Sequence, residues 1–310
     1  MVNTAVNLSG VSLENPVIPA SGTFGFGYEF AQWYDINCLG AISVKGTTRE
    51  PRFGNPAPRI AETTGGMLNA VGLQNPGIDK VIGEELPKLR TLYHKPILAN
   101  ISGFSLDEFV ECCAKADASP HTDIIEVNVS CPNVRNLTHL QDKETLKEIL
   151  RGLLDFRRGQ NQYRPILLKI SPDLTTAQLD DVTALMQEGG IDGIVATNTT
   201  TSREGLATDS RTLADIGNGG MSGAPLTRRS LETVRYIHEK TEGRFPIIGV
   251  GGIMTEDDAV AMLDAGADLI QVYTGFIYNG PAFVKRICKR LRFEADKRSA
   301  GEQRTDNAGE

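Results

Sequence analysis

The sequence has few of the residues that bind metals or form disulfide bonds. Its 310 residues include five cysteines and four histidines, and no two cysteines have the C-x-x-C spacing of a zinc or iron–sulfur site. An odd number of scattered cysteines is typical of reduced thiols in a cytoplasm. The sequence therefore argues against a disulfide scaffold and predicts that this chain holds no metal.

An excess of positive charge and long apolar runs are also missing. The 32 Lys and Arg residues are scattered, and 39 Asp and Glu residues outnumber them to give a net charge of −7. This balance does not favour nucleic acid or anionic lipid as a partner. No run approaches the roughly 18 apolar residues of a membrane span, and residues 1–16 do not resemble a signal peptide. We expect a cytoplasmic protein without a membrane or nucleic-acid partner.

Short apolar runs alternate with amphipathic stretches along the chain, after a hairpin expected over Val6 to Leu13. The runs are typical of buried parallel strands. They lie at residues 16–21, 40–45, 96–102, 123–130, 165–171, 192–198, 246–252 and 268–275. Helical patterns between them include those that begin at Thr145, Thr176 and Thr255. Eight such units in 310 residues predict an α/β fold, a closed (β/α)8 TIM barrel, rather than an open doubly wound sheet.

The barrel is expected to form a single domain over residues 1–292. Residues 293–310 are polar and lack periodicity, which predicts a disordered C-terminal tail. The connections at residues 46–78 and 199–226 are longer than ordinary loops, and both follow strands at the end where barrels build their active sites. We expect these long strand-to-helix loops to form the walls of a substrate site.

Polar residues and glycines follow every expected strand, and the carboxyl ends of barrel strands converge on one face. A single Asn or Ser there could simply cap a helix, but the set as a whole favours a binding site. After the last two strands, Gly251-Gly252 and Thr274-Gly275 fit a phosphate site made of backbone N–H groups, to which Ser222-Gly223 could add donors. Glycines that only permit tight turns are the alternative.

Two lysines and a cysteine give this face its chemistry. Lys45 and Lys169 interrupt apolar strands, and a buried ammonium group needs a polar or negative partner such as the pyrimidine edge of a reduced flavin. Cys131 directly follows a strand, so its thiol could act as a nucleophile or as a general base. The other four cysteines are interpreted as small core residues.

Amide side chains are abundant in the same segments. They suit a small planar ligand with imide and carboxylate groups better than a sugar or a peptide. The asparagines in question are Asn69, Asn128, Asn133 and Asn198.

Five ordered motifs resemble the dihydroorotate dehydrogenase family, and the resemblance runs from about Leu8 to Leu291. The motifs are NPVIPASGTFGFG (15–27), VKGTTREPRFGNPAPR (44–59), NAVGLQNPG (69–77), EVNVSCPN (126–133) and IIGVGGI (247–253). They are most similar to the class 1 catalytic chain that works with an iron–sulfur flavoprotein subunit and passes electrons to NAD. The resemblance implies an FMN-dependent oxidoreductase that converts dihydroorotate to orotate in pyrimidine biosynthesis.

The family's site residues can be carried over to matching positions, with one FMN per chain. The implied FMN-binding residues are Ala20, Ser21, Lys45, Gly46, Asn100, Asn128, Lys169, Thr197, Gly223, Gly251, Gly252, Thr274 and Gly275. The implied dihydroorotate-binding residues are Lys45, Asn69, Ala70, Val71, Gly72, Leu73, Asn128, Asn133, Asn198 and Thr199. The implied base is Cys131, which would remove the C5 proton of dihydroorotate while a hydride leaves C6.

The resemblance also implies a second subunit. This chain has no second dinucleotide fingerprint and no cluster-binding cysteine set, so FAD and a [2Fe–2S] cluster would belong to the partner. We expect a homodimer of this chain at the centre of a heterotetramer. The segment YTGFIYNGP (273–281) is more similar to the quinone-linked class. That class, however, has an N-terminal membrane-associating extension and a serine base, whereas the implied base here is Cys131. The resemblance therefore favours NAD as the final electron acceptor.

Three alternatives remain open, the first of them within the same family. A single-subunit enzyme could pass the electrons to fumarate. A flavin-free barrel synthase or aldolase could use Lys45 or Lys169 to form a Schiff base. A binding module without activity is the third.

Overall fold

Eight parallel strands form the centre of the molecule in the computed structural model, which describes residues 4–130, 143–160, 163–188, 191–204, 206, 208–217 and 219–306. In spatial order the strands are β3 (Val17–Pro19), β13 (Leu269–Val272), β12 (Ile247–Val250), β10 (Gly193–Ala196), β9 (Ile166–Ile170), β8 (Ile124–Asn128), β7 (Ile97–Ile101) and β4 (Ile42–Ser43). The N–H of Gly40 donates to the carbonyl of Val17 at 2.9 Å, which brings the two edge strands together. The predicted barrel and all its expected strands are confirmed.

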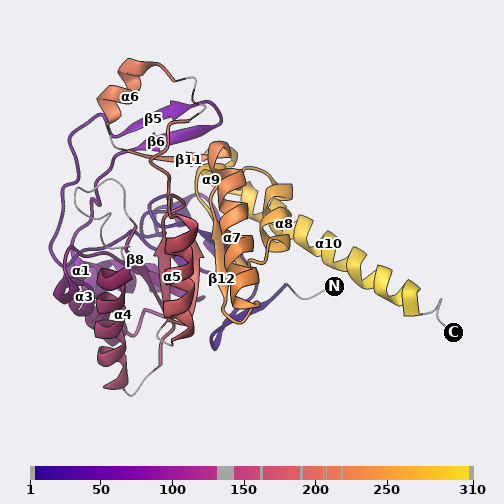
Figure 1. Cartoon of the computed structure of the whole chain (residues 1–310), viewed down its shortest axis with the longest axis horizontal. Coiled ribbons are helices and arrows are strands. Elements are labelled where there is room, and N and C mark those ends of the chain that lie inside the picture. The colour runs from indigo at the N-terminus through magenta and orange to yellow at the C-terminus, as the bar shows by residue number, and fades with distance from the viewer. Residues whose placement is uncertain are drawn as a thin grey trace.

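Helices pack around this sheet (Figure 1). They are α1 (Ile78–Lys80), α2 (Leu86–Arg90), α3 (Leu106–Ala118), α4 (Lys143–Arg158), α5 (Thr176–Gln187), α7 (Thr227–Thr241), α8 (Glu256–Asp264), α9 (Thr274–Asn279) and α10 (Ala282–Asp306). Shorter helical turns are η1 (Phe30–Gln32), η2 (Ile36–Cys38), η3 (Val81–Glu85) and η5 (Ala224–Leu226). Thr175 and Thr255 begin α5 and α8 with capping boxes, which satisfy first-turn N–H groups. The helices expected from Thr145, Thr176 and Thr255 are confirmed.

The interior of the barrel changes character along its axis. Every strand, or the residue just before it, contributes at least one apolar side chain to a buried cluster, which includes Ile18, Ala41, Leu98, Ile124, Leu167, Val195, Ile248 and Leu269. The hairpin of β1 (Val6–Leu8) and β2 (Val11–Leu13) adds Leu8 and Leu13. Because side chains alternate between the two faces of a strand, the interior positions two residues later belong to the next layer. That layer contains the buried polar residues Ser43, Asn100, Glu126, Lys169 and Gln271.

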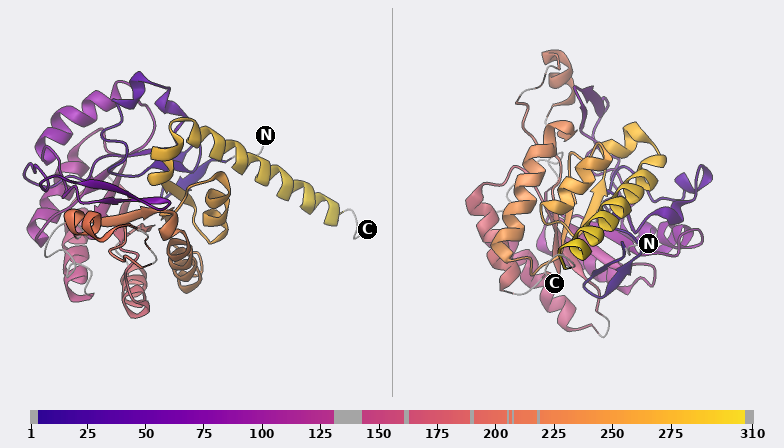
Figure 2. Two further views of the ribbon diagram at one scale, coloured as in Figure 1. Left: turned by 90° about the horizontal axis from the view of Figure 1, so that it is seen from above. Right: turned by 90° about the vertical axis from the view of Figure 1, so that its right-hand side faces the viewer.

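The two long connections contain strands of their own and form a small sheet over the barrel, which we call the cap sheet. It consists of β5 (Ile60–Thr63), β6 (Gly66–Asn69) and β11 (Gly220–Gly223), with α6 (Ser210–Ile216) beside it. Strand β11 pairs antiparallel with β6, and Leu68, Ala70, Ile216 and Met221 form a separate apolar cluster. Figures 1 and 2 show the cap sheet lying across the mouth of the barrel.

Helix α10 departs from the sequence prediction. We expected residues from Phe293 onward to be disordered, but α10 continues to Asp306 and projects away from the barrel (Figure 2). The prediction missed ion pairs that support the helix, including Arg290 with Glu294 one turn later and Arg298 with Asp264 of α8 at 2.6 Å. In the part of the chain that is described, no helix is both long and apolar enough to cross a membrane.

Candidate active site

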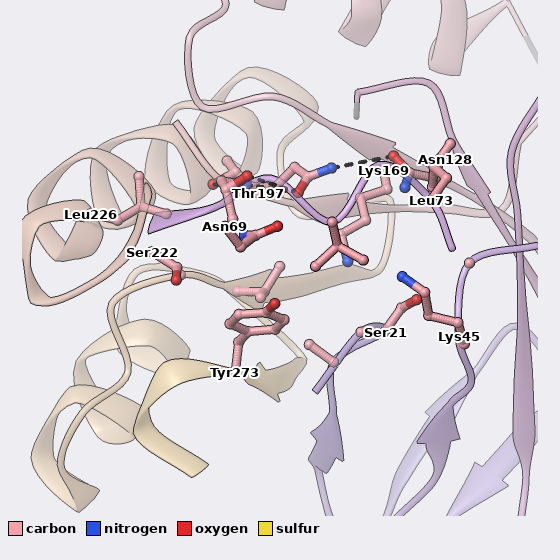
Figure 3. A pocket seen from close by; sticks show the side chains of 18 of the residues that line it. Ser21, Lys45, Asn69, Leu73, Asn128, Lys169, Thr197, Ser222, Leu226 and Tyr273 are labelled. Carbon is pink, nitrogen blue, oxygen red and sulfur yellow. Dashed lines mark hydrogen bonds between the residues drawn. The ribbon is translucent and has the colours of Figure 1, made fainter. Parts of the chain in front are cut away.

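A cavity of about 350 Å³ lies at the carboxyl ends of the barrel strands, beneath the cap sheet (Figure 3). This volume is within the usual range for small-molecule sites. Most residues predicted from the sequence line it: Ala20, Ser21, Lys45, Gly46, Asn69, Val71, Gly72, Leu73, Asn128, Lys169, Thr197, Asn198, Thr199 and Gly251. The fold therefore gathers segments that are up to 231 residues apart in the sequence, from position 20 to position 251, around one space.

A smaller hollow of about 20 Å³ adjoins this cavity and shares Ser222, Gly251 and Tyr273 with it. The remaining predicted residues of the phosphate site line the hollow, namely Gly223, Gly252, Thr274 and Gly275. The Thr274 hydroxyl donates to Oγ of Ser222 at 2.7 Å, so the start of α9, just after β13, is tied to the cap sheet at this point.

The two glycines that follow β12 are required by packing. Gly251 has φ +115° and Gly252 has φ +74°, a region that side chains rarely adopt. A Cβ on Gly252 would lie 2.2 Å from Cα of Thr227, and one on Gly251 would lie 2.3 Å from Oγ of Ser230. Packing therefore requires glycine at both positions, and both glycines line the hollow.

Two asparagines at the mouth orient each other. Asn198 Nδ2 donates to Oδ1 of Asn128 at 3.3 Å and to Oγ of Ser130 at 3.0 Å. Oδ1 of Asn128 also accepts from the backbone N–H of Ser130 at 3.1 Å, which fixes which end of this amide is the oxygen. Nδ2 of Asn128 makes no hydrogen bond to another described residue, and Asn128 lines the cavity (Figure 3). The pair consequently offers a ligand an N–H donor.

Both lysines predicted for the site point into the cavity (Figure 3). The sequence interpretation assigned the compensation of Lys169 to a ligand, but the protein supplies a counter-charge itself. Lys169 is 5% exposed, and its Nζ lies 3.0 Å from Oε1 of the fully buried Glu126 and 3.3 Å from Oε1 of Gln271. Glu126 was missed although it precedes Asn128 by two positions and must therefore share its face of β8.

Asn100 and Ala70 lie behind the residues that line the cavity. Asn100 is 1% exposed beneath Gly46, and its Nδ2 donates to Oε1 of Glu126 at 2.6 Å. Its Oδ1 atom is buried without a hydrogen-bond partner among the described residues. Ala70 packs in the apolar cluster of the cap sheet.

The predicted base and one predicted substrate ligand cannot be placed. Cys131 and Asn133 lie outside the described residues. The chain leading to them is fixed at Ser130, whose backbone carbonyl accepts from Nδ2 of Asn198 at 3.2 Å.

Further residues line the cavity that the sequence prediction did not assign to it: Gly22, Gln74, Leu226, Val250 and Tyr273. Gln74 and Tyr273 directly adjoin predicted site residues, so proximity in sequence could have found them. Leu226 and Val250 are apolar and carry no chemical signal that separates them from core residues.

The other cysteines fit the predicted structural role. Burial raises the pKa of Cys112 and Cys113 to about 12 and that of Cys288 to about 11, which disfavours their thiolates. Cys38 is half-buried, and burial raises its pKa as well. Among the described residues, no group of three or more His, Cys, Asp or Glu side chains could hold a metal ion.

Comparisons with known proteins agree with this geometry. The family model described as dihydroorotate dehydrogenase matches residues 3–294. The chain is 41% identical over 280 residues to the "Dihydroorotate dehydrogenase B (NAD(+)), catalytic subunit" of Geobacillus kaustophilus, covering 88% of this chain and 85% of that protein. It is 39% identical over 304 residues to the protein of the same name from Listeria monocytogenes, covering 96% and 94%.

Two solved structures of dihydroorotate dehydrogenases are also similar to this chain. A ligand-free dihydroorotate dehydrogenase from Eimeria tenella matches with a TM-score of 0.82 at 28% identity, covering 93% of this chain and 86% of that one. A second structure of the Eimeria tenella enzyme, in complex with ferulenol, matches with a TM-score of 0.79 at 26% identity, covering 95% and 85%. The chain belongs to the dihydroorotate dehydrogenase family.

Proposed function

We propose that this chain is the catalytic subunit of an NAD-linked dihydroorotate dehydrogenase, which oxidises dihydroorotate to orotate with FMN as its cofactor. One observation carries the proposal: motifs shared with the family and far apart in the sequence line a single cavity at the mouth of the barrel. That cavity combines two lysines with a cluster of amides, which suits an anionic, imide-containing substrate.

The cavity and its adjoining hollow fit FMN. The hollow is bounded by Gly223, Gly252 and Gly275, and backbone N–H groups at such glycine-rich turns can bind a phosphate group. At the other end, Lys169 lines the cavity and provides a cation. When bound, FMN would supply the acceptor for the hydride.

The chain's own residues would bind and orient the substrate. The Lys45 ammonium and Nδ2 of Asn128 are donors suited to its carboxylate and carbonyl oxygens. Asn198 would hold Asn128 in the required orientation through the hydrogen bond between their amides. The cap sheet would cover the substrate and reduce the access of water.

The general base in this proposal is Cys131. Its thiolate would take the proton from C5 of dihydroorotate, and the hydride would leave from C6. A free cysteine has a pKa of about 8.5, so neighbouring hydrogen-bond donors or alkaline pH would favour the active thiolate.

The electrons would leave this chain through a second subunit that carries FAD and a [2Fe–2S] cluster. The relatives from Geobacillus and Listeria are named catalytic subunits, which supports such a division of labour. The described residues also include no candidate metal-binding group. A homodimer at the centre of a heterotetramer and a cytoplasmic location remain part of the proposal.

The visible spectrum of the purified chain tests the proposal. We expect flavin absorption bands that bleach when dihydroorotate is added without oxygen, and slow NAD reduction until the second subunit is added. A colourless chain would contradict the proposal and favour a flavin-free synthase or aldolase. Rapid reduction of NAD by the isolated chain would contradict the partner, and rapid reduction of fumarate would assign the chain to the single-subunit class.

A further inference from the structure

Glu126 lies inside the barrel, fully buried, and accepts four hydrogen bonds from side chains on four other strands or their ends. Its Oε1 accepts from Nδ2 of Asn100 at 2.6 Å and from Nζ of Lys169 at 3.0 Å. Its Oε2 accepts from Nε2 of Gln271 at 2.8 Å and from Oγ of Ser43 at 3.0 Å. Both carboxylate oxygens are therefore fully engaged, and the side chain has one fixed orientation.

The network leads from this carboxylate to both ligand spaces. Lys169 lines the main cavity, and Gln271 lines the adjoining hollow. Lys169 also donates to Oε1 of Gln271 at 3.3 Å. An ammonium group has three N–H donors. Glu126 and Gln271 engage two of them, which leaves the third for a ligand in the cavity.

Stability alone does not explain this network. A buried ion pair contributes little net stability, because removing two charges from water costs about as much as their attraction returns. The neighbouring layer of the same barrel is filled by apolar side chains such as Leu167 and Ile248. The interior can thus be packed without charges, and the polar network lies only in the layer next to the cavity.

We propose that Glu126 is a positioning residue that holds the Lys169 ammonium at the floor of the cavity and neutralises part of its charge. The inference rests on the proposed function, because the charge at this point would act on bound FMN. Reduced flavin is more negative than oxidised flavin, and a lone cation in a site of low polarity would favour the reduced form strongly. The carboxylate moderates that preference.

The variant Glu126→Gln tests the proposal, because it removes the charge and keeps the shape. We expect the ratio of the affinities for reduced and oxidised FMN to rise at least tenfold, which corresponds to about 30 mV for a two-electron couple. The midpoint potential of the bound flavin, measured by dye-coupled titration, gives this ratio without a turnover assay. An unchanged or lower ratio would overturn the proposal.

A matched control is available on a different part of the barrel. Asp117 and Arg164 form another buried ion pair, with Oδ1 and Nη1 3.3 Å apart, and line neither the cavity nor the hollow. We expect Asp117→Asn and Glu126→Gln both to lower the melting temperature, but Asp117→Asn should leave the flavin potential unchanged. A similar shift of potential in both variants would show that loosened packing causes it, which would overturn the proposal.

A second comparison applies if Glu126→Gln does not fold. In Lys169→Met the carboxylate is left without its cation, so adding Glu126→Gln should raise the affinity ratio at least tenfold relative to Lys169→Met. Equal ratios in the single and double variants would overturn the proposal. A wild-type chain that binds no FMN would overturn the proposed function as well, whereas equal ratios in proteins that bind FMN would leave the proposed function intact.

Discussion

The two layers of the barrel interior differ in what they contribute. The layer nearer the hairpin is apolar, from Ile18 and Ala41 around to Leu269. The layer nearer the cap sheet contains Glu126, Lys169 and their polar partners, and it forms the floor of the cavity. The same strands supply both layers at positions two residues apart. The apolar layer therefore contributes mainly to stability, and the polar layer contributes to the chemistry of the site. Substitutions in the first should lower the free energy of unfolding, and substitutions in the second should change ligand binding or the flavin potential.

The largest effect is expected for the proposed general base. Cys131→Ala should slow flavin reduction by dihydroorotate about 10²- to 10⁴-fold, because a general base contributes that much to a proton transfer. FMN and orotate should still bind, since the base acts in the chemical step. Rapid-mixing measurements of flavin absorbance check this prediction, and reduction at nearly the wild-type rate would exclude Cys131 as the base.

Substitutions in the apolar layer should lower stability and leave the kinetics unchanged. Leu167 is fully buried in the barrel interior. Leu167→Ala should therefore lower the free energy of unfolding by about 2–5 kcal/mol through lost burial and a residual cavity. The folded variant should keep the wild-type KM for dihydroorotate. Denaturant unfolding and steady-state kinetics test both parts, and a raised KM with unchanged stability would refute the separation of the layers.

Asn198 tests the contribution of the asparagine pair at the mouth of the barrel to substrate binding. Asn198→Ala removes the donor that orients Asn128, so we expect the KM for dihydroorotate to rise about tenfold, equivalent to about 1.4 kcal/mol. Asn37→Ala is a suitable control, because Asn37 hydrogen-bonds to the carbonyl of Leu92 away from the cavity. Equal KM values for the two variants would argue against the role of Asn198.

The smallest effect is expected outside the barrel. The Thr255 hydroxyl accepts from the N–H of Asp258 and caps α8. Thr255→Ala should cost about 1 kcal/mol of stability and change neither kinetics nor flavin potential. Thermal unfolding measures the loss. A change in potential would mean that the helical layer and the site are coupled more closely than the packing indicates.

The barrel could be predicted from the sequence because its strands have a strong local signal. Runs such as PILLKIS are apolar and rich in β-forming residues, and each is bounded by turn residues. The cap sheet lacks that signal. Strands β6 (GMLN) and β11 (GMSG) are short and contain glycine, and they pair across about 150 residues of chain, which local reasoning does not detect.

The candidate site was predictable to a similar extent. Residues such as Lys45 and Asn198 were found because the ends of parallel strands must converge. Glu126, the partner of Lys169, was not found. Predicting this pair requires the register between β8 and β9, in which Asn128 rather than Glu126 lies directly opposite Lys169. Continuation of α10 to Asp306 was missed because ion pairs with α8, rather than apolar periodicity, accompany it.

The cap sheet has a consequence for engineering this enzyme. Its strand β6 belongs to the connection after β4, and β11 belongs to the connection after β10, four strands away in the eight-stranded order. The two connections hydrogen-bond to each other above the cavity, from Asn69 opposite Gly220 to Gly66 opposite Gly223. They therefore behave as one exchangeable part that spans the mouth. A graft that replaces either connection alone would leave a sheet edge without its complement, so a new substrate specificity would have to be transplanted as the pair.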